Sequence, residues 1–171
     1  MSNIPEIDNC CDKEPYAFFG LAAYWAQTLE SGALNLAIVL RLPDVNLVTQ
    51  DLFEELYSEL TRKTLGQLLS QAKKAIDISE ANIKYLDEAL ELRNILTHHY
   101  FREHAEDFVS EVGRQEMKEE LQGIISKFKN ADKILDSIYL PLWEKYGVNE
   151  EFIERELEQM RIEAAARDRG A

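Results

Sequence analysis

The chain has 171 residues, of which 46% are hydrophobic and 30% are charged, a balance typical of one folded domain with a buried core. It contains only 7 Gly and 4 Pro, is rich in Ala, Leu, Glu, Lys and Gln, and lacks strand-like alternation, so we predict an all-α protein. The formal net charge of -13 argues against general binding to nucleic acid or anionic membranes. An RNA site would therefore require a local cluster of basic side chains.

We expect three parts: a flexible tail at residues 1–14, a helical bundle at residues 15–146, and a C-terminal helix with a frayed end at residues 147–171. The tail carries adjacent cysteines, Cys10 and Cys11, which lack the spacing of a zinc site and rarely form a structural bridge. We interpret them as reduced thiols of a cytoplasmic protein. The tail has no basic start before an apolar run, as a secretory signal would.

Apolar residues three and four apart predict an up-and-down bundle of about five helices. The first follows Pro15 and covers residues 16–42, ending at Pro43 and Asp44; its apolar part is too short to cross a bilayer. Its aromatic residues suit a core, with a ligand pocket as the alternative. The second helix runs from residue 46 or 49 to 60, and Thr64 caps a shorter third helix with the Lys73-Lys74 pair near its end. The fourth runs from Ser79 to Phe101 or His104, and the fifth from Ser110 or Gly113 through Ile138.

Pro141 and the Tyr146-Gly147 turn are expected to break this pattern. Asn149 then caps a final amphipathic helix, whose narrow apolar stripe is Ile153, Leu157, Met160 and Ala164. Such a helix either lies back on the bundle or binds a second chain.

The unusual chemistry is concentrated in residues 93–101, at the end of the fourth predicted helix. The apolar stripe of that helix would continue at Arg93, Asn94 and Thr97, so a cation, an amide and a hydroxyl stand where core residues are expected. Burying such groups without partners costs roughly 1–3 kcal/mol each, and more for a charge. This segment therefore needs internal partners or a second surface, which makes it the first candidate site.

Asn94 and His98 lie one turn apart on a regular helix, so the amide of Asn94 is placed to hold one imidazole nitrogen and fix its tautomer. Arg93 and His98 are about 140° apart around the helix axis and share a cleft most easily where two such helices meet at a dimer axis. A histidine with a near-neutral pKa and a bidentate arginine suit phosphodiester transfer within RNA. That chemistry requires no metal.

The pattern Arg93-x4-His98-x-Tyr100, with Asn94 after the arginine, resembles the HEPN superfamily and is most similar to the HepT-like toxins. The resemblance implies a bundle of about four or five helices that dimerises with its motif helices facing each other. It implies a metal-independent endoribonuclease of toxin–antitoxin or defence type, in which Arg93 and His98 are catalytic and Asn94 orients the histidine. It also implies a nucleotidyltransferase antitoxin that modifies Tyr100 with AMP.

Basic residues near the motif, Arg102 and Arg114 together with Lys118, are candidates for binding phosphate. We expect no cofactor. The histidines at positions 98, 99 and 104 are close enough for a metal site to be considered, but the carboxylate spacing is poor apart from Glu103, four residues after His99.

Each motif residue also has an ordinary structural interpretation. Arg93 would pair with an acid on its own or a neighbouring helix, the histidines would lie on the surface, and Tyr100 and Phe101 would belong to the core. The alternative function is a non-catalytic helical dimerisation or regulatory module. For that module we expect Arg93 in salt bridges, and for a nuclease we expect an open basic groove beside His98.

Overall fold

The computed structural model describes residues 13–170, which form helices and no strand, so the prediction of an all-α protein is confirmed. The elements in chain order are α1 (Glu14–Val39), the 3-10 turn η1 (Val45–Leu47), α2 (Gln50–Leu60), α3 (Leu65–Ala75), α4 (Glu80–His98), α5 (Tyr100–Glu103), α6 (Ala105–Phe108), α7 (Glu111–Glu144) and α8 (Glu150–Gly170). The predicted flexibility of the tail, and Cys10 and Cys11, lie outside the described residues. Among those residues, none of the helices combines the length and the hydropathy required to span a bilayer.

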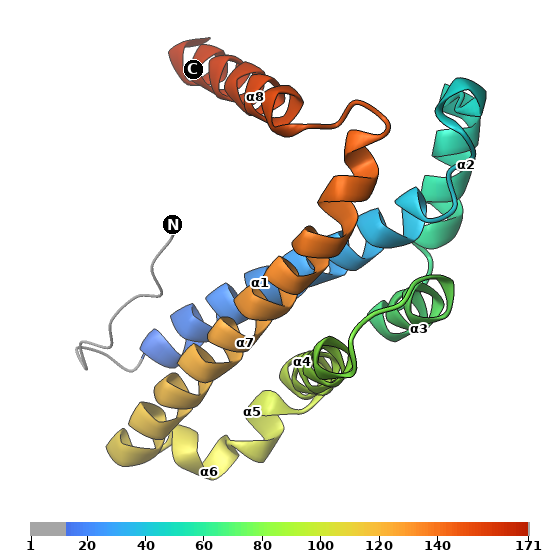
Figure 1. The fold of residues 1–171 in the computed structure, drawn as a ribbon. Coiled ribbons are helices and arrows are strands. Elements are labelled where there is room, and N and C mark those ends of the chain that lie inside the picture. The colour runs from blue at the N-terminus through green and yellow to red at the C-terminus, as the bar shows by residue number, and fades with distance from the viewer. Residues whose placement is uncertain (1–12, 171) are drawn as a thin grey trace.

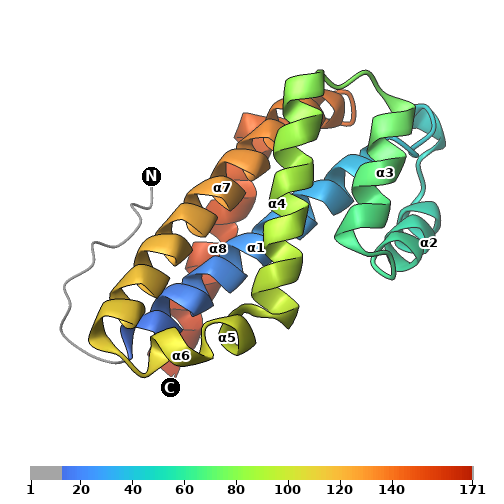
Figure 2. The same cartoon turned by 90° about the horizontal axis from the view of Figure 1, so that it is seen from below.

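The two longest bundle helices, α1 and α7, pack side by side and run in the same direction (Figure 1). At their N-terminal ends the Lys118 ammonium lies 2.6 Å from the Glu14 carboxylate. Near the other end of α1, the Trp143 indole N–H donates to the Asn35 carbonyl at 3.3 Å. Helix α4 runs antiparallel to both and packs across them, while α2 and α3 lie beside the C-terminal half of α1 (Figure 2).

The core lies between α1, α3, α4 and α7, where apolar stripes predicted from the sequence face one another. Ten of its residues have no exposed surface: Ala22, Leu29, Leu36, Leu60, Ala89, Leu121, Ile125, Phe128, Ala131 and Leu135. Burying a large apolar side chain contributes about 1.5–3 kcal/mol, so this shared interface is the main source of stability.

The predicted helix starts are confirmed by side-chain caps. The hydroxyls of Thr49, Thr64, Ser79 and Ser110 accept hydrogen bonds from backbone N–H groups three residues later. At Thr64 the Gln67 side chain also accepts from the Thr64 backbone, completing a capping box. The local sequence therefore fixes where four helices begin.

Two helix ends differ from the prediction. Helix α1 stops at Val39, before Pro43 and Asp44 are reached. The motif helix stops at His98 instead of continuing to Phe101 or His104, because His99 leaves helical geometry at φ -132°. The chain then forms the short helices α5 and α6, and the break turns the Tyr100 side chain inward until only 1% of it is exposed.

Pro141 does not end α7 but lies inside its final turns, and the helix continues to Glu144. An internal proline typically costs a helix about 3 kcal/mol through a lost hydrogen bond and a steric clash. Contacts with α1 and with the segment that follows it offset this cost, since the Trp143 indole binds α1 and the Tyr146 hydroxyl donates to the Pro43 carbonyl at 2.9 Å. Gly147, at φ 82°, then turns the chain towards α8.

The cap of α8 is confirmed, because the Asn149 side chain accepts from the Phe152 N–H at 2.9 Å. The helix continues through Gly170, past the point at which the sequence predicts fraying. It stands away from the bundle and belongs to no part of the core (Figure 1).

Gly113, in the first turn of α7, lies against the backbone of the preceding corner. A Cβ atom there would approach the Asp107 carbonyl oxygen to 2.3 Å. We therefore expect Gly113→Ala to lower the free energy of unfolding by about 1–3 kcal/mol, measured by urea denaturation. Gly123→Ala, in the same helix with open space around the new methyl group, should instead raise it by roughly 0.5–1 kcal/mol. Equal effects of the two substitutions would contradict this account of the corner.

Candidate functional site

Arg93 of the motif is held by an acid on another helix. Its Nε and one terminal nitrogen both lie 2.5 Å from Oε1 of Glu30 in α1. The remaining terminal nitrogen donates to the Asn94 side-chain oxygen at 3.3 Å. With 23% of the arginine side chain and 35% of the glutamate side chain exposed, this ion pair lies at the edge of the α1–α4 interface.

A shallow pocket of about 260 Å³ opens beside this ion pair, between α1 and α4. Its apolar side is formed by Phe19, Ala23, Ala26 and Leu96, and its polar side by Gln27, Glu30, Arg93 and Thr97. The Thr97 hydroxyl donates to the Arg93 backbone carbonyl at 2.9 Å, so its proton is already used within the helix. A phosphate in this pocket would have to compete with the Glu30 carboxylate for Arg93.

His98 is the last residue of α4 and is exposed. Within residues 13–170 its imidazole makes no hydrogen bond, and the ring lies 6.1 Å from that of His99. The predicted hydrogen bond from Asn94 is absent within this part of the chain, because the Asn94 oxygen accepts from Arg93. The structure therefore brings Arg93 and Asn94 together and leaves the His98 imidazole directed at solvent.

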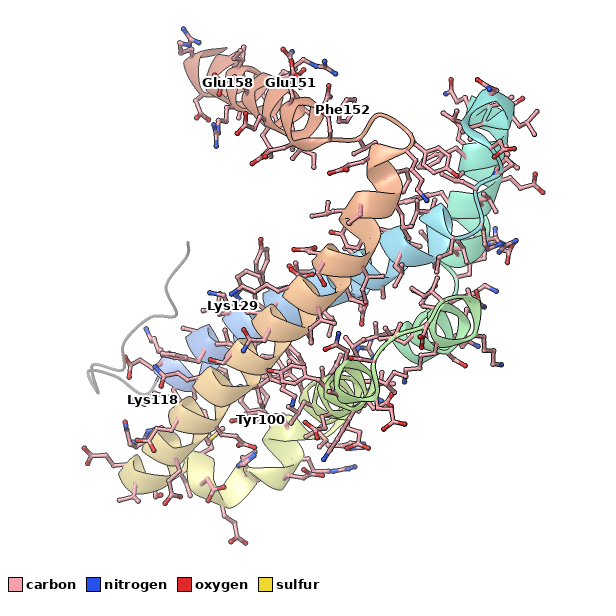
Figure 3. The ribbon with its side chains drawn as sticks, viewed as in Figure 1. Tyr100, Lys118, Lys129, Glu151, Phe152 and Glu158 are labelled. Carbon is pink, nitrogen blue, oxygen red and sulfur yellow. The ribbon has the colours of Figure 1, made fainter. Side chains whose placement is uncertain are left out.

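Tyr100 is enclosed by the bundle where α5 meets α7 (Figure 3). Its hydroxyl donates to the Met117 carbonyl at 3.0 Å, and its ring packs against Phe19 and His104. Burial, and secondarily the nearby Glu120 carboxylate, raise the pKa of the hydroxyl far above its usual range, so it stays protonated. Transfer of AMP to this oxygen would require α5 to move away from α7.

The third histidine, His104, links two carboxylates. Its Nδ1 lies 2.9 Å from Asp107 and its Nε2 lies 3.0 Å from Glu120, so both ring nitrogens are occupied. Among the described residues, no group of three or more His, Cys, Asp or Glu side chains is arranged to hold a metal ion. His104 thus joins the α5–α6 corner to α7.

The candidate phosphate-binding cations do not form one groove. Arg114 donates to the Phe108 carbonyl at 3.1 Å, and Lys118 is 4% exposed beside Glu14. Arg102 is exposed, with a terminal nitrogen 2.6 Å from Nδ1 of His99. Of these three candidates, Arg102 is the exposed one, and it lies four residues after His98 in the sequence.

Sequence reasoning missed the acids that meet the motif, chiefly Glu30 and Glu120. Glu30 is 63 residues from Arg93, and nothing in its local sequence distinguishes it from other helical glutamates. Glu30 could have been identified as the partner of Arg93 only if the antiparallel packing of α1 against α4 were already known.

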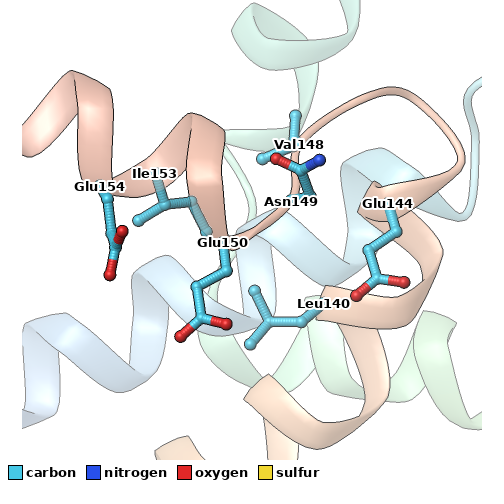
Figure 4. A pocket seen from close by; sticks show the side chains of 7 residues that line it. All are labelled: Leu140, Glu144, Val148, Asn149, Glu150, Ile153 and Glu154. Atoms are coloured by element: carbon cyan, nitrogen blue, oxygen red, sulfur yellow. The ribbon is translucent and has the colours of Figure 1, made fainter.

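A larger hollow, of about 460 Å³, lies at the elbow between α7 and α8 (Figure 4). Apolar side chains of Leu140, Val148 and Ile153 form part of it, and three carboxylates, Glu144, Glu150 and Glu154, surround them. Its negative charge makes it unsuitable for a phosphate.

We compared the chain with protein-family models, with characterised proteins and with solved structures, and none of the three comparisons found a match. The resemblance to the HEPN superfamily therefore remains a prediction from the motif.

Asp132 of α7 is a half-buried carboxylate away from the motif. One of its oxygens would lie 3.0 Å from a Cβ added at Gly32 of α1, which shows how closely the carboxylate approaches that helix. Burial, with a smaller contribution from Asp136, raises the pKa of the Asp132 carboxyl to about 6.

This pKa predicts a pH-dependent effect of Asp132→Asn. The folded-state pKa is higher than the usual 3.8, so the parent protein loses stability relative to the variant as the pH rises from 3.8 through about 6. At pH 8 we expect the variant to be more stable by about 1 kcal/mol, because solvent screening reduces the effect of the full shift. At pH 3.5 the difference should disappear in thermal unfolding. A gain of the same size at both pH values, or an equal gain from exposed Asp44→Asn, would contradict the assignment.

Proposed function

We propose that the chain is a HEPN-like, metal-independent endoribonuclease of toxin–antitoxin or defence type, acting in the cytoplasm as a homodimer. Arg93 and His98 are the catalytic residues, and α4 faces its symmetry mate across the dimer axis. The observation that carries the proposal is the exposed imidazole of His98, which has no hydrogen-bond partner among the described residues, on the same helix as Arg93 and within the Arg93-x4-His98-x-Tyr100 pattern.

In this mechanism His98 takes the proton of a ribose 2′-hydroxyl or gives one to the leaving oxygen. Arg93 binds the phosphate and stabilises the charge that develops in the transition state. The exposed Arg102 guanidinium lies beside His98 in the chain and supplies a second phosphate contact. Arg114 makes at most an indirect contribution, since its guanidinium binds a backbone carbonyl.

In such a nuclease, the Glu30 carboxylate has to release Arg93 before the guanidinium can bind phosphate. While this carboxylate binds Arg93, the positive charge of the guanidinium is compensated and two of its nitrogens are occupied, so the pocket beside it attracts phosphate less strongly. Assembly of the dimer or arrival of RNA would exchange the Glu30 contact for a phosphate contact. A nucleotidyltransferase antitoxin that modifies Tyr100 would act on a conformation in which α5 has opened.

The second candidate function is a non-catalytic helical dimerisation or regulatory module. The Arg93–Glu30 ion pair favours it, as does the dispersal of the basic residues around the motif. In that case Arg93 fixes α4 against α1 and His98 contacts a partner protein.

The decisive experiment is cleavage of a mixed tRNA and mRNA pool in EDTA by the purified protein. The nuclease proposal predicts cleavage by the parent and a loss of at least 100-fold in both Arg93→Ala and His98→Ala. The control is Arg62→Ala, an exposed arginine on the α2–α3 connection, which should cleave like the parent. A folded parent, free of any adduct on Tyr100, that leaves RNA intact would favour the non-catalytic module.

Removing the Glu30 charge separates the two candidates further. If the ion pair holds Arg93 away from phosphate, Glu30→Gln should raise kcat/KM for RNA by roughly 3- to 10-fold, corresponding to about 1 kcal/mol. The matched control is Glu88→Gln, which removes the α4 partner of Lys127 instead. Lower thermal stability with no gain in cleavage would assign the ion pair a purely structural role.

A further inference from the structure

Helix α8 is a long helix without a partner in its own chain. Its 21 residues stand apart from the bundle, and Leu157, Met160 and Ile162 are 46%, 65% and 53% exposed (Figure 1). Figure 3 shows that α8 points away from α7; the labelled side chains on it are Glu151, Phe152 and Glu158. Most of the stability of a helix in a protein comes from packing of its amphipathic face, and within the described part of the chain α8 has no such packing.

One face of α8 has the spacing of a coiled-coil seam. Six residues recur at alternating steps of three and four: Glu150, Ile153, Leu157, Met160, Ala164 and Arg167. The four central residues are apolar, and a charged residue stands at each end. This is the pattern of a short two-helix seam.

The charge along α8 selects the orientation of such a pair. Residues 150–160 contain five glutamates and one arginine, a net charge of -4, whereas residues 161–170 contain three arginines, one glutamate and one aspartate, a net charge of +1. Parallel pairing would place the two -4 halves together. Antiparallel pairing places each -4 half beside a +1 half, so it is electrostatically favoured.

The ends of the seam are also complementary. In an antiparallel pair centred between Glu158 and Gln159, Leu157 faces Met160 of the other copy, Ile153 faces Ala164, and Glu150 faces Arg167. That arrangement brings Arg167 of the second copy to the acidic hollow formed by Glu144, Glu150 and Glu154 (Figure 4). Within residues 13–170 these three carboxylates and Arg167 make no hydrogen bond or ion pair, so all four are free to take an intermolecular partner.

We propose that α8 is a self-association surface that binds α8 of a second copy of this chain in antiparallel orientation, with Arg167 of each copy in the α7–α8 hollow of the other. The surface is isologous, as expected for a two-fold pair. It is distinct from the α4 surface, since the two helices lie on different sides of the α1–α7 pair, and it does not depend on nuclease activity (Figure 1). If both surfaces operate, assemblies larger than a dimer form, and loss of the α8 contact returns them to dimers joined at α4.

The test is sedimentation equilibrium of the full chain over a range of concentrations. The seam variant Leu157→Glu with Met160→Glu should lower the average mass at micromolar concentration, with at least a tenfold rise in the dissociation constant. The control, Gln159→Glu with Ala166→Glu, adds the same charge on the outer face of α8 and should behave like the parent. Because α8 lies outside the core, both variants should keep the circular dichroism of the bundle.

A charge exchange tests the antiparallel register. Arg167→Glu should weaken association, and adding Glu150→Arg to that variant should restore it, because the pair is re-formed with its signs reversed. Arg169→Glu is the matched control, since its Nε donates to the Ala165 carbonyl of its own helix. A monomeric parent, an unchanged mass in the seam variant, an equal loss in the controls, or a failure of Glu150→Arg to restore association would each overturn the proposal.

Discussion

The contact between Arg93 and Glu30 decides how the motif helix is presented. It joins α4 to α1 at the edge of the core, where an unpaired guanidinium would carry a desolvation cost that a carboxylate partner removes. Leu86, Ala89 and Leu96 form the buried face of α4, so Arg93 lies at the edge of that face and His98 stays at the surface. The structural role of Arg93 and the catalytic role that we propose for it therefore require the same side chain, which can bind either Glu30 or a phosphate.

Burial of Tyr100 is the second constraint on this region. Its hydroxyl binds the Met117 carbonyl inside the bundle, and the chain leaves helical geometry at His99 just before this residue turns inward. His104 then holds the corner to α7 through Glu120. The motif thus ends in a corner held to α7 by these contacts, and His98 is the last residue of α4 before it. The His98 ring is therefore exposed to solvent although the Tyr100 hydroxyl, two residues later, is buried.

Most helix starts could be predicted from the sequence, because a cap such as Thr64 with Gln67 is a local signal. The apolar stripes of α1, α4 and α7 likewise indicated which faces are buried. The end of α4 could not be predicted, since it depends on packing of Tyr100 against residues of α1 and α7. Pro141 was misleading for the same reason: contacts made by Trp143 and Tyr146 keep α7 helical beyond it. The identity of the candidate site came from residue types and spacing, whereas its electrostatic partner Glu30 depends entirely on tertiary structure.

The central claim is that phosphate displaces Glu30 from Arg93, on the same helix as His98. Its most direct test is nuclear magnetic resonance of the arginine side-chain Nε–H groups and the histidine rings, during titration with a short RNA whose 2′-oxygens are methylated and therefore uncleavable. The account predicts that the Arg93 Nε–H and His98 signals shift together and saturate at one concentration, while the Arg114 signal stays in place. An unperturbed Arg93 signal at RNA concentrations that shift other residues would show that Glu30 keeps its arginine, and would contradict the claim.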